Sequence, residues 1–287
     1  MKHAAAVGPS SMGPSSPVEA YKRALDTAQG LPRPRLEGEV LVAYTGAAEA
    51  PARILYTALT HSGSKALIAH AVEAARHIVP YRDIDTVLIY SPSGRDPRTL
   101  SLAETASLVG GGRVALVTPQ MHPAYREKAE SLGVDLVELT SRAPPILAMA
   151  LASLYWAPKQ MGPRAGRLEA EVGELASALE WAIETLGANP GHAGLEALYT
   201  PAAKPGAIYH CAATGCMPRP LEAVLSMHRG AEAVAYMTSV DEQDYRDVTA
   251  SHTARGIKLH VIRINTDPIT AGLYSILAAL LITQKPL

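Results

Sequence analysis

TVLIYSPSGRDPRTLSLAE, residues 86–104, passes from an apolar run through a tight turn into a helix. Residues 86–90 are rich in β-branched side chains, which is typical of a strand buried on both faces. Asp96 and Pro97 suit the N-cap and the first position of a helix. A strand that leads directly into a helix is the basic unit of a parallel α/β sheet.

The same alternation of strand and helix extends outward from this stretch. Residues 65–79 are ambiguous, because ALIAH fits a strand whereas VEAARHIV fits a helix. The other predicted strands cover residues 39–44, 113–118, 134–139, 207–211, 233–237 and 258–264. Predicted helices cover residues 18–28, 48–60, 97–109, 123–132, 144–156, 167–186, 193–199, 220–227, 241–254 and 268–281. The pattern predicts an α/β fold with parallel sheets and helices on both faces.

Breaks in this alternation predict the domain organisation. Residues 1–17, rich in Gly, Pro and Ser, read as a mobile tail. Residues 18–157 form the first α/β unit, and the alternation then stops at APKQMGPR. Residues 158–190 contain a long amphipathic helix that reads as a linker or packing helix. Residues 191–287 form a second, shorter α/β unit.

Composition excludes several classes of function. The chain has 287 residues, of which 48% are hydrophobic and 18% charged, which is typical of a folded globular protein. Its net charge of −1 gives no basic excess for binding nucleic acid. Two cysteines cannot form a disulfide framework, so we expect a reducing, cytoplasmic location. The longest apolar runs are too short to span a membrane. Asparagine and glutamine are scarce and prolines are many, which favours a thermophilic source.

The SPSG turn after residues 86–90 has the parts of an anion site. Ser91 and Ser93 supply hydroxyl groups, Gly94 permits unusual backbone geometry, and the following helix presents its positive end. The plainer alternative is a strand-to-helix turn in which the serines only cap and solvate. The sequence lacks the glycine patterns of dinucleotide and nucleoside triphosphate loops, and it lacks HExxH. The HC-x4-C segment at residues 210–216 has no second pair of ligands, so no metal site is predicted.

Several motifs resemble those of the sugar isomerase (SIS) domain family. SPSGRDPRT, residues 91–99, is similar to the family signature S-x-S-G-x-T-x-E-T. EVLVAYTGAAEAPARIL and GGGRVALVT occupy the places of other family strands and loops, and ELTSRAPPILAMALASL resembles a segment of the bifunctional phosphoglucose/phosphomannose isomerases. The resemblance implies two flavodoxin-like SIS subdomains, a sugar phosphate ligand, no metal or cofactor, and a homodimer with its active site at the subunit interface.

The resemblance assigns a phosphosugar-binding role to individual residues. Ser91, Ser93 and Gly94 match the phosphate loop, and Thr99 matches its later threonine. The remaining matches are Gly46 in the first glycine-rich loop and Arg142, which falls on a substrate-contacting arginine. Departures from the pattern are Ala47 for a loop serine, Asp96 for a phosphate-binding threonine and Arg98 for a glutamate.

Asp96 is the departure with the largest physical consequence. Its carboxylate would compete with a phosphate for the same N–H groups, and two unit charges about 4 Å apart repel by roughly 4 kcal/mol at an effective dielectric constant of 20. Arg95 and Arg98 would offset this repulsion if they folded back over the loop. Alternatively, Asp96 simply caps the helix and both arginines face water. We therefore expect a site retuned away from tight phosphate binding.

The catalytic groups of the family are not preserved. Its glutamate falls near residues 228–229, and its histidine falls near Tyr245. An aldose–ketose isomerase needs a base that carries a proton between C1 and C2. Glu232 and Glu242 are the candidate bases, with His228 nearby; a solvated helix end with an ordinary ion pair is the alternative interpretation of His228 and Glu232.

Two functions follow. The first is a sugar-phosphate isomerase that acts on substrates of the glucose-6-phosphate and mannose-6-phosphate type. The alternative is a noncatalytic phosphosugar-binding or regulatory protein that kept the scaffold and lost the base.

Overall fold

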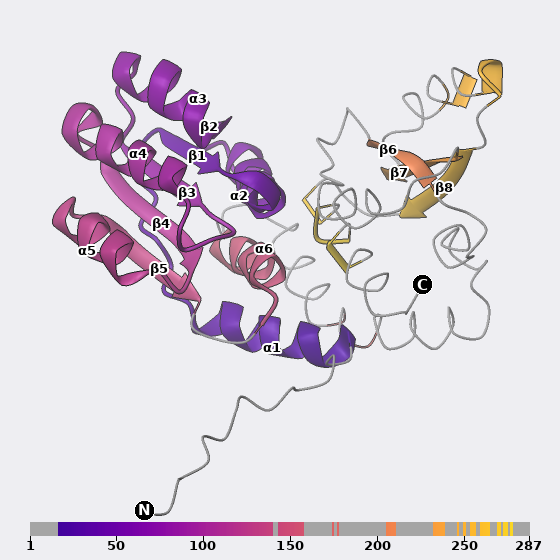
Figure 1. Cartoon of the computed structure of the whole chain (residues 1–287), viewed down its shortest axis with the longest axis horizontal. Coiled ribbons are helices and arrows are strands. Elements are labelled where there is room, and N and C mark those ends of the chain that lie inside the picture. Colours follow the sequence, from indigo (N-terminus) through magenta and orange to yellow (C-terminus); the bar gives the residue numbers. More distant parts are fainter. Residues whose placement is uncertain are drawn as a thin grey trace, which may run out of the picture.

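The first α/β unit contains one five-stranded parallel sheet (Figure 1). The computed structural model describes residues 17–139 and 143–157, the backbone of residues 205–210, 232–238 and 259–264, and scattered positions between 174 and 277. The strand order is β2-β1-β3-β4-β5. The strands are β1 (Val40–Tyr44), β2 (Ala66–His70), β3 (Thr86–Tyr90), β4 (Arg113–Pro119) and β5 (Asp135–Leu139). The predicted parallel α/β fold is confirmed.

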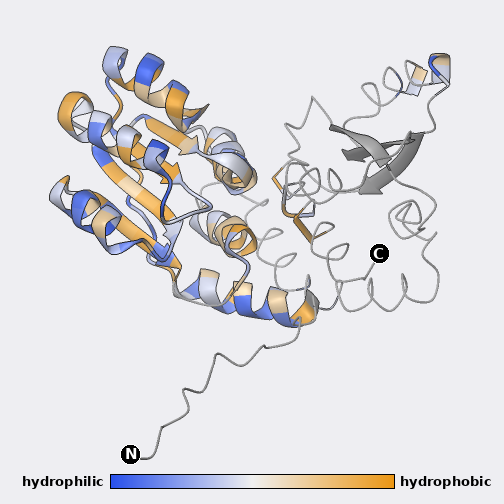
Figure 2. Ribbon diagram, viewed as in Figure 1, coloured by the Kyte–Doolittle hydropathy of each residue, from blue (hydrophilic) through white to orange (hydrophobic). Residues whose placement is uncertain are grey.

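Helices cover both faces of this sheet, and the alternating side chains of each strand divide the core into two clusters. The first face packs against α1 (Pro17–Gly30), α2 (Glu49–His61) and α6 (Pro145–Trp156). The second face packs against α3 (Ala71–Glu73), α4 (Pro97–Thr105) and α5 (Pro123–Ser131). Figure 2 shows this burial of apolar side chains, with hydrophobic colour along the strands and on the inner sides of the helices.

The ambiguous residues 65–79 contain both a strand and a helical segment. β2 covers the ALIAH run, and α3 follows it directly. The helical path continues as a π-turn, η2 (Ala74–Ile78), and a 3-10 turn, η3 (Val79–Tyr81). The predicted helix at 97–109 likewise consists of α4 and a π-turn, η4 (Ala106–Gly110), and it ends at Gly111 with a left-handed φ of 62°.

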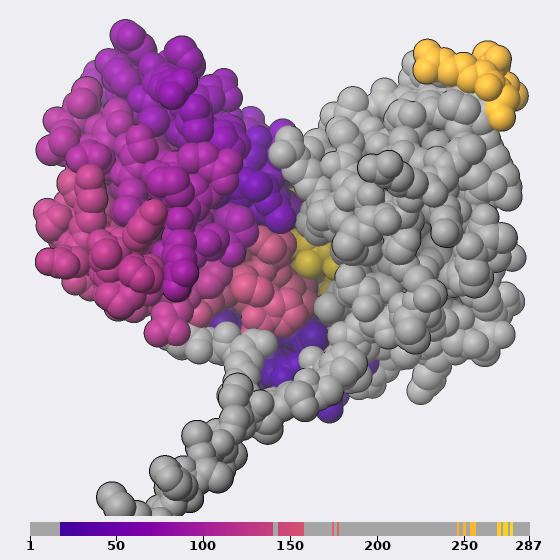
Figure 3. Space-filling view, in the orientation of Figure 1, coloured from indigo at the N-terminus to yellow at the C-terminus, as the bar shows by residue number. Residues whose placement is uncertain are grey.

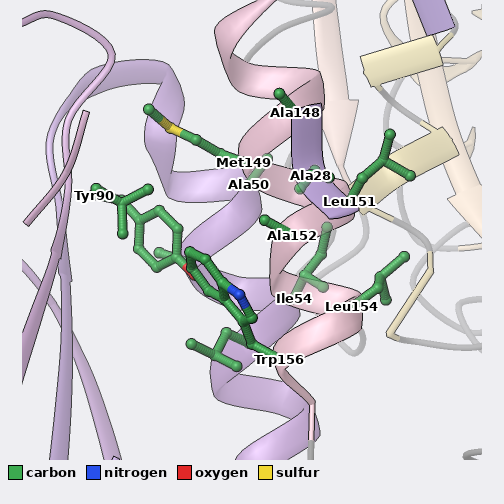
Figure 4. Packing of buried hydrophobic residues seen from close by; sticks show 14 of the residues in the cluster. Ala28, Ala50, Ile54, Tyr90, Ala148, Met149, Leu151, Ala152, Leu154 and Trp156 are labelled. Carbon is green, nitrogen blue, oxygen red and sulfur yellow. The ribbon is translucent and has the colours of Figure 1, made fainter. Parts of the chain in front are cut away.

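α6 is apolar on nearly all sides because it lies between other elements of the core (Figure 4). Its neighbours include α1 and α2. Trp156 lies beside the ring of Tyr90, with ring centroids 6.5 Å apart. The Tyr90 hydroxyl is 2.7 Å from Ser153 Oγ, which itself donates to the Met149 carbonyl. Since the Ser153 hydroxyl gives its hydrogen to Met149, the Tyr90 hydroxyl is the donor of this pair, and burial raises the pKa of Tyr90 so that it keeps its proton.

Residues near the end of the chain complete the core on the first face. Ile269, Leu273, Ile276 and Leu277 are buried in the same cluster as α2 and α6, and their spacing is that of one helix face. A Cβ added at Gly272 would lie 3.3 Å from Ile54 Cγ1, so this segment packs closely on α2. Figure 3 shows the yellow atoms of this segment beside the pink atoms of α6.

The second predicted unit contains a three-stranded parallel sheet of order β6-β7-β8. Its strands are β6 (Pro205–His210), β7 (Glu232–Thr238) and β8 (Leu259–Ile264), which agree with the predicted strands. The predicted helices at 167–186, 193–199, 220–227 and 241–254 lie wholly or mostly outside the described residues. Within the described part of the chain, no helix combines the length and apolar character that crossing a membrane requires.

Candidate ligand site at the carboxyl edge of the first sheet

The chain leaves β1 and β3, which are adjacent strands, toward opposite faces of the sheet. After β1 it enters α2 on the first face, and after β3 it enters α4 on the second. Ligands of open α/β sheets bind at the carboxyl ends of the strands where the connections diverge in this way. This rule places the candidate site between the β1–α2 and β3–α4 turns, a position that we term the crevice.

A row of polar side chains crosses the carboxyl edge beneath α4. Thr45 and Ser91 each follow the last paired residues of β1 and β3, Tyr44 and Tyr90. Ser91 N donates to the carbonyl of Val117 in β4. Thr118, which follows Val117, lies opposite Glu138 in the pairing of β4 with β5. The alternation of side chains places this row on the second face of the sheet. The row consists of Thr45, Ser91, Thr118 and Glu138.

Hydrogen bonds within the β3–α4 turn hold its two serines. The Ser91 hydroxyl is buried and donates to the Ser93 carbonyl at 2.8 Å. Ser93 is exposed, and its hydroxyl accepts from Arg95 N at 3.2 Å. Ser91 therefore shapes the turn, whereas Ser93 is the serine that faces solvent at the mouth of the crevice.

Gly94 is required by close approach rather than by a left-handed backbone. It has no positive φ, but an added Cβ would lie 2.3 Å from the Gln120 carbonyl oxygen. The β4–α5 turn lies directly against it, and His122 N donates to the Gly94 carbonyl at 3.2 Å. On the other side of the crevice, Gly46 has a φ of +51°, and a Cβ there would lie 3.6 Å from Pro92 Cγ. The β1–α2 and β3–α4 turns therefore lie close together.

Asp96 occupies the N-terminus of α4. Its Oδ1 accepts a hydrogen bond from Arg98 N at 3.0 Å, as an N-cap does. The Arg98 side chain folds back, with Nε 2.9 Å from Asp96 Oδ1 and Nη2 2.7 Å from Oδ2. Thr99 Oγ1 donates to the Asp96 carbonyl at 2.7 Å. Asp96 is thus both the helix cap and one half of an ion pair, while Arg95 is exposed.

The surroundings of Asp96 favour its charged form. Burial acts to raise the pKa of Asp96, but the hydrogen bonds from Arg98 outweigh burial and hold the pKa below its ordinary value. The Thr45 hydroxyl lies close enough to contribute to this lowering. Thr45 is fully buried, and its hydroxyl oxygen meets the geometry of a full hydrogen bond with no group in the described part of the chain. A ligand group that took the place of the Asp96 carboxylate would meet this buried hydroxyl.

Three carboxylate–arginine pairs surround the carboxyl edge. Asp96 pairs with Arg98 of α4, and Glu49, at the start of α2, accepts from Arg53 Nε and Nη2 at 3.1 and 3.0 Å. Glu138 of β5 pairs with Arg126 of α5 and accepts from Met121 N at 2.8 Å. Each helix that follows β1, β3 or β4 therefore brings an arginine to a carboxylate at this edge.

The structure brings five of the predicted phosphosugar-binding residues to the two turns or to the start of α4: Gly46, Ser91, Ser93, Gly94 and Thr99. Arg142, His228 and Glu242 lie outside the described residues, as do Cys211 and Cys216. Glu232 begins β7, where only the backbone is described. Within the described residues, no group of three or more His, Cys, Asp or Glu is arranged to hold a metal ion.

Thr45, Thr118 and Glu138 are site residues that the sequence interpretation missed. Each is a polar residue at or just after the end of an apolar strand run, in VLVAYT, VALVT and DLVE. Because parallel strands align their carboxyl ends at one edge, that position is a usable signal. This signal identifies the row of polar side chains, but it does not show which of their hydroxyl groups have hydrogen-bond partners.

Most of the chain is similar in structure to solved proteins whose names refer to phosphorylated sugars. The C-terminal domain of glucosamine-fructose-6-phosphate aminotransferase from Francisella tularensis matches at a TM-score of 0.67 and 10% identity, over 96% of both chains. Glucosamine-6-phosphate deaminase from Thermotoga maritima matches at 0.65 and 12%, over 93% of this chain and 92% of that one. The chain has the SIS fold.

A third structure with this SIS fold is tagatose-6-phosphate ketose/aldose isomerase from Escherichia coli. It matches at a TM-score of 0.60 and 11% identity, over 92% of this chain and 86% of that one. No model of a protein family matches the sequence, and no curated protein matches it either. The likeness therefore lies in the fold, at identities of 10 to 12% in these three comparisons.

Proposed function

We propose that this SIS-fold chain binds a sugar phosphate in the crevice between the β1–α2 and β3–α4 turns and is a sugar-phosphate isomerase-like protein. The observation that carries the proposal is the divergence of these turns at adjacent strands, with the buried Thr45 hydroxyl and the exposed Ser93 at the crevice. Similar structures that act on glucosamine-6-phosphate and tagatose-6-phosphate support the class of ligand.

Ligand binding tests this proposal directly. Fructose-6-phosphate should raise the melting temperature of the protein, because a ligand that binds only the folded state stabilises it. Thr45→Val combined with Ser93→Ala should remove most of this shift, whereas Ser131→Ala, at an exposed serine of α5, should leave it unchanged. An unchanged shift in the double variant would locate the ligand elsewhere, and no shift in the wild type at millimolar ligand would contradict the proposal.

The finer proposal is aldose–ketose isomerisation of a substrate of the glucose-6-phosphate or mannose-6-phosphate type. Glu232 or Glu242 would act as the base, with His228 nearby, and Arg142 would contact the substrate. A coupled assay that starts from fructose-6-phosphate tests this activity. Glu232→Gln or Glu242→Gln should abolish turnover while leaving ligand-induced stabilisation intact.

A second function is noncatalytic phosphosugar binding, and one observation favours it. Asp96, Glu49 and Glu138, the carboxylates described at the crevice and its flanks, each form an ion pair with an arginine, which opposes their use as a proton-transferring base. Stabilisation by fructose-6-phosphate without turnover would establish this second function.

We also propose that the protein forms a homodimer. Among the described residues, Tyr81, Leu108 and Val109 are large apolar side chains that are 78%, 72% and 61% exposed, and they lie on the adjoining turns η3 and η4. Light scattering would show a mass of two chains. Leu108→Glu should weaken the dimer if this surface takes part in it, and a monomeric wild type would contradict the proposal.

A further inference from the structure

We propose that Asp96 is an internal competitor of the ligand's phosphate and sets how tightly the crevice binds it. This inference rests on the proposed function and concerns the same site. The Asp96 carboxylate accepts a first-turn N–H of α4 and the fork of Arg98. These donors are the kind that a phosphate would use at a helix N-terminus.

The competition is electrostatic as well as steric. Asp96 is only 7% exposed, so solvent screens its charge weakly. A phosphate dianion at the start of α4 would face this like charge and would find the positive end of the helix already compensated. Arg98, whose side chain is 48% exposed, can turn from the carboxylate to an incoming phosphate without leaving the mouth of the crevice.

The Thr45 hydroxyl is the independent sign that a ligand group belongs beside Asp96. It is fully buried, it lies close to the Asp96 carboxylate, and it has no full hydrogen bond within the described residues. A buried hydroxyl that lacks a full hydrogen bond costs free energy until a better-placed partner arrives. Thr45 therefore lies at the inner end of the position for which the phosphate and the Asp96 carboxylate compete.

The test measures the affinity for fructose-6-phosphate by calorimetry in the wild type and in Asp96→Asn. Asparagine keeps the helix cap, so the variant retains the turn while losing the charge. The affinity should rise at least tenfold, and Asp96→Ser should give a gain of the same sign. Unphosphorylated fructose should show no such gain, since it brings no charge to the start of α4.

Two further variants separate the cause from a general charge effect. Asp135→Asn removes the same charge from an exposed position at the start of β5, where the amino ends of the strands lie, away from the carboxyl ends that border the crevice. It should change the affinity less than twofold. Arg98→Ala in the Asp96→Asn background should remove most of the gain, because Arg98 is the group released to the phosphate. Circular dichroism and melting temperature confirm that each variant is folded.

The outcomes distinguish this inference from the function on which it rests. Binding by the wild type that becomes at least tenfold tighter in Asp96→Asn supports the inference. A wild type that binds fructose-6-phosphate with an affinity that Asp96→Asn leaves unchanged or weakens overturns the inference and leaves the proposed function standing. Absence of binding by both proteins overturns both.

Discussion

The β1–α2 and β3–α4 turns meet at the same crevice but begin their helices differently. α4 has a side-chain cap, because Asp96 accepts from Arg98 N and Pro97 occupies the first helical position. α2 begins through the 3-10 turn η1 (Gly46–Ala48), and no side chain caps it; its first residue, Glu49, pairs instead with Arg53 one turn later.

This difference separates the structural and ligand-facing roles of the two turns. The β3–α4 turn is fixed by its own hydrogen bonds and by the β4–α5 turn packed on Gly94. The β1–α2 turn instead contributes the Thr45 hydroxyl, which lacks a full hydrogen bond within the described residues. We therefore expect substitutions at Ser91 and Gly94 to affect mainly stability, and those at Thr45 to affect binding with little effect on stability.

The largest effect is expected from Gly94→Ala. The new Cβ would lie 2.3 Å from the Gln120 carbonyl oxygen, which is backbone and cannot rotate away. Overpacking of this kind should lower the free energy of unfolding by about 2–3 kcal/mol, measured by urea denaturation. Gly30→Ala is the matched control, since its Cβ meets nothing within 4 Å. Equal stability of the two variants would show that the β4–α5 turn can yield.

Loss of the cap should have the next largest effect. Asp96→Ala removes both the N-cap and the partner of Arg98, so the free energy of unfolding should fall by about 1–2 kcal/mol. Asp96→Asn should lose less, because its side-chain oxygen still accepts from the helix N-terminus. Urea denaturation of the two variants measures the difference. If Asp96→Ala is as stable as the wild type, the cap contributes nothing and the contrast between the turns fails.

A smaller, pH-dependent effect should follow from the lowered pKa of Asp96. Because the folded-state pKa lies below the unfolded value of about 3.9, the carboxylate contributes stability above that value. This contribution is lost as the pH falls through the folded-state pKa. The wild type should therefore lose stability faster than Asp96→Asn as the pH is lowered from about 5, measured by thermal unfolding across this range. Parallel stability curves would mean that the ion pair does not favour the charged form.

The smallest effect on stability is expected at Thr45. Thr45→Val replaces a buried hydroxyl that lacks a full hydrogen bond within the described residues by a methyl group of similar shape. The free energy of unfolding should stay within about 0.5 kcal/mol of the wild type or rise slightly. Ser91→Ala, which removes a hydroxyl that donates to the Ser93 carbonyl, should cost about 1 kcal/mol. A large loss in Thr45→Val would show that its hydroxyl already has a strong partner.

The sequence predicted the strands of the first sheet because apolar runs such as TVLIY are bounded by clear turn residues. Residues 65–79 stayed ambiguous because a short apolar run fits either a strand or a helix, and only packing beside β1 makes Ala66–His70 a strand. Gly94 was expected to permit unusual backbone geometry, whereas the structure requires a glycine there because the turn after β4 packs directly against it. No local pattern reveals a contact between residues that far apart.

By itself, the sequence determined the alternation of strands and helices and the N-cap at Asp96, since both depend on residues close together in the chain. Tertiary structure alone decided that Arg98 folds back on Asp96, and that Thr45 stands beside them without a full hydrogen bond among the described residues. It also decided that Ile269, Leu273, Ile276 and Leu277 join the core beside the five-stranded sheet. The last two features depend on parallel pairing and on side-chain packing, which join residues separated by tens to hundreds of positions. Arg98 and Asp96 are only two positions apart, but their spacing fits equally an Arg98 side chain that faces water, so only the structure decides between the two.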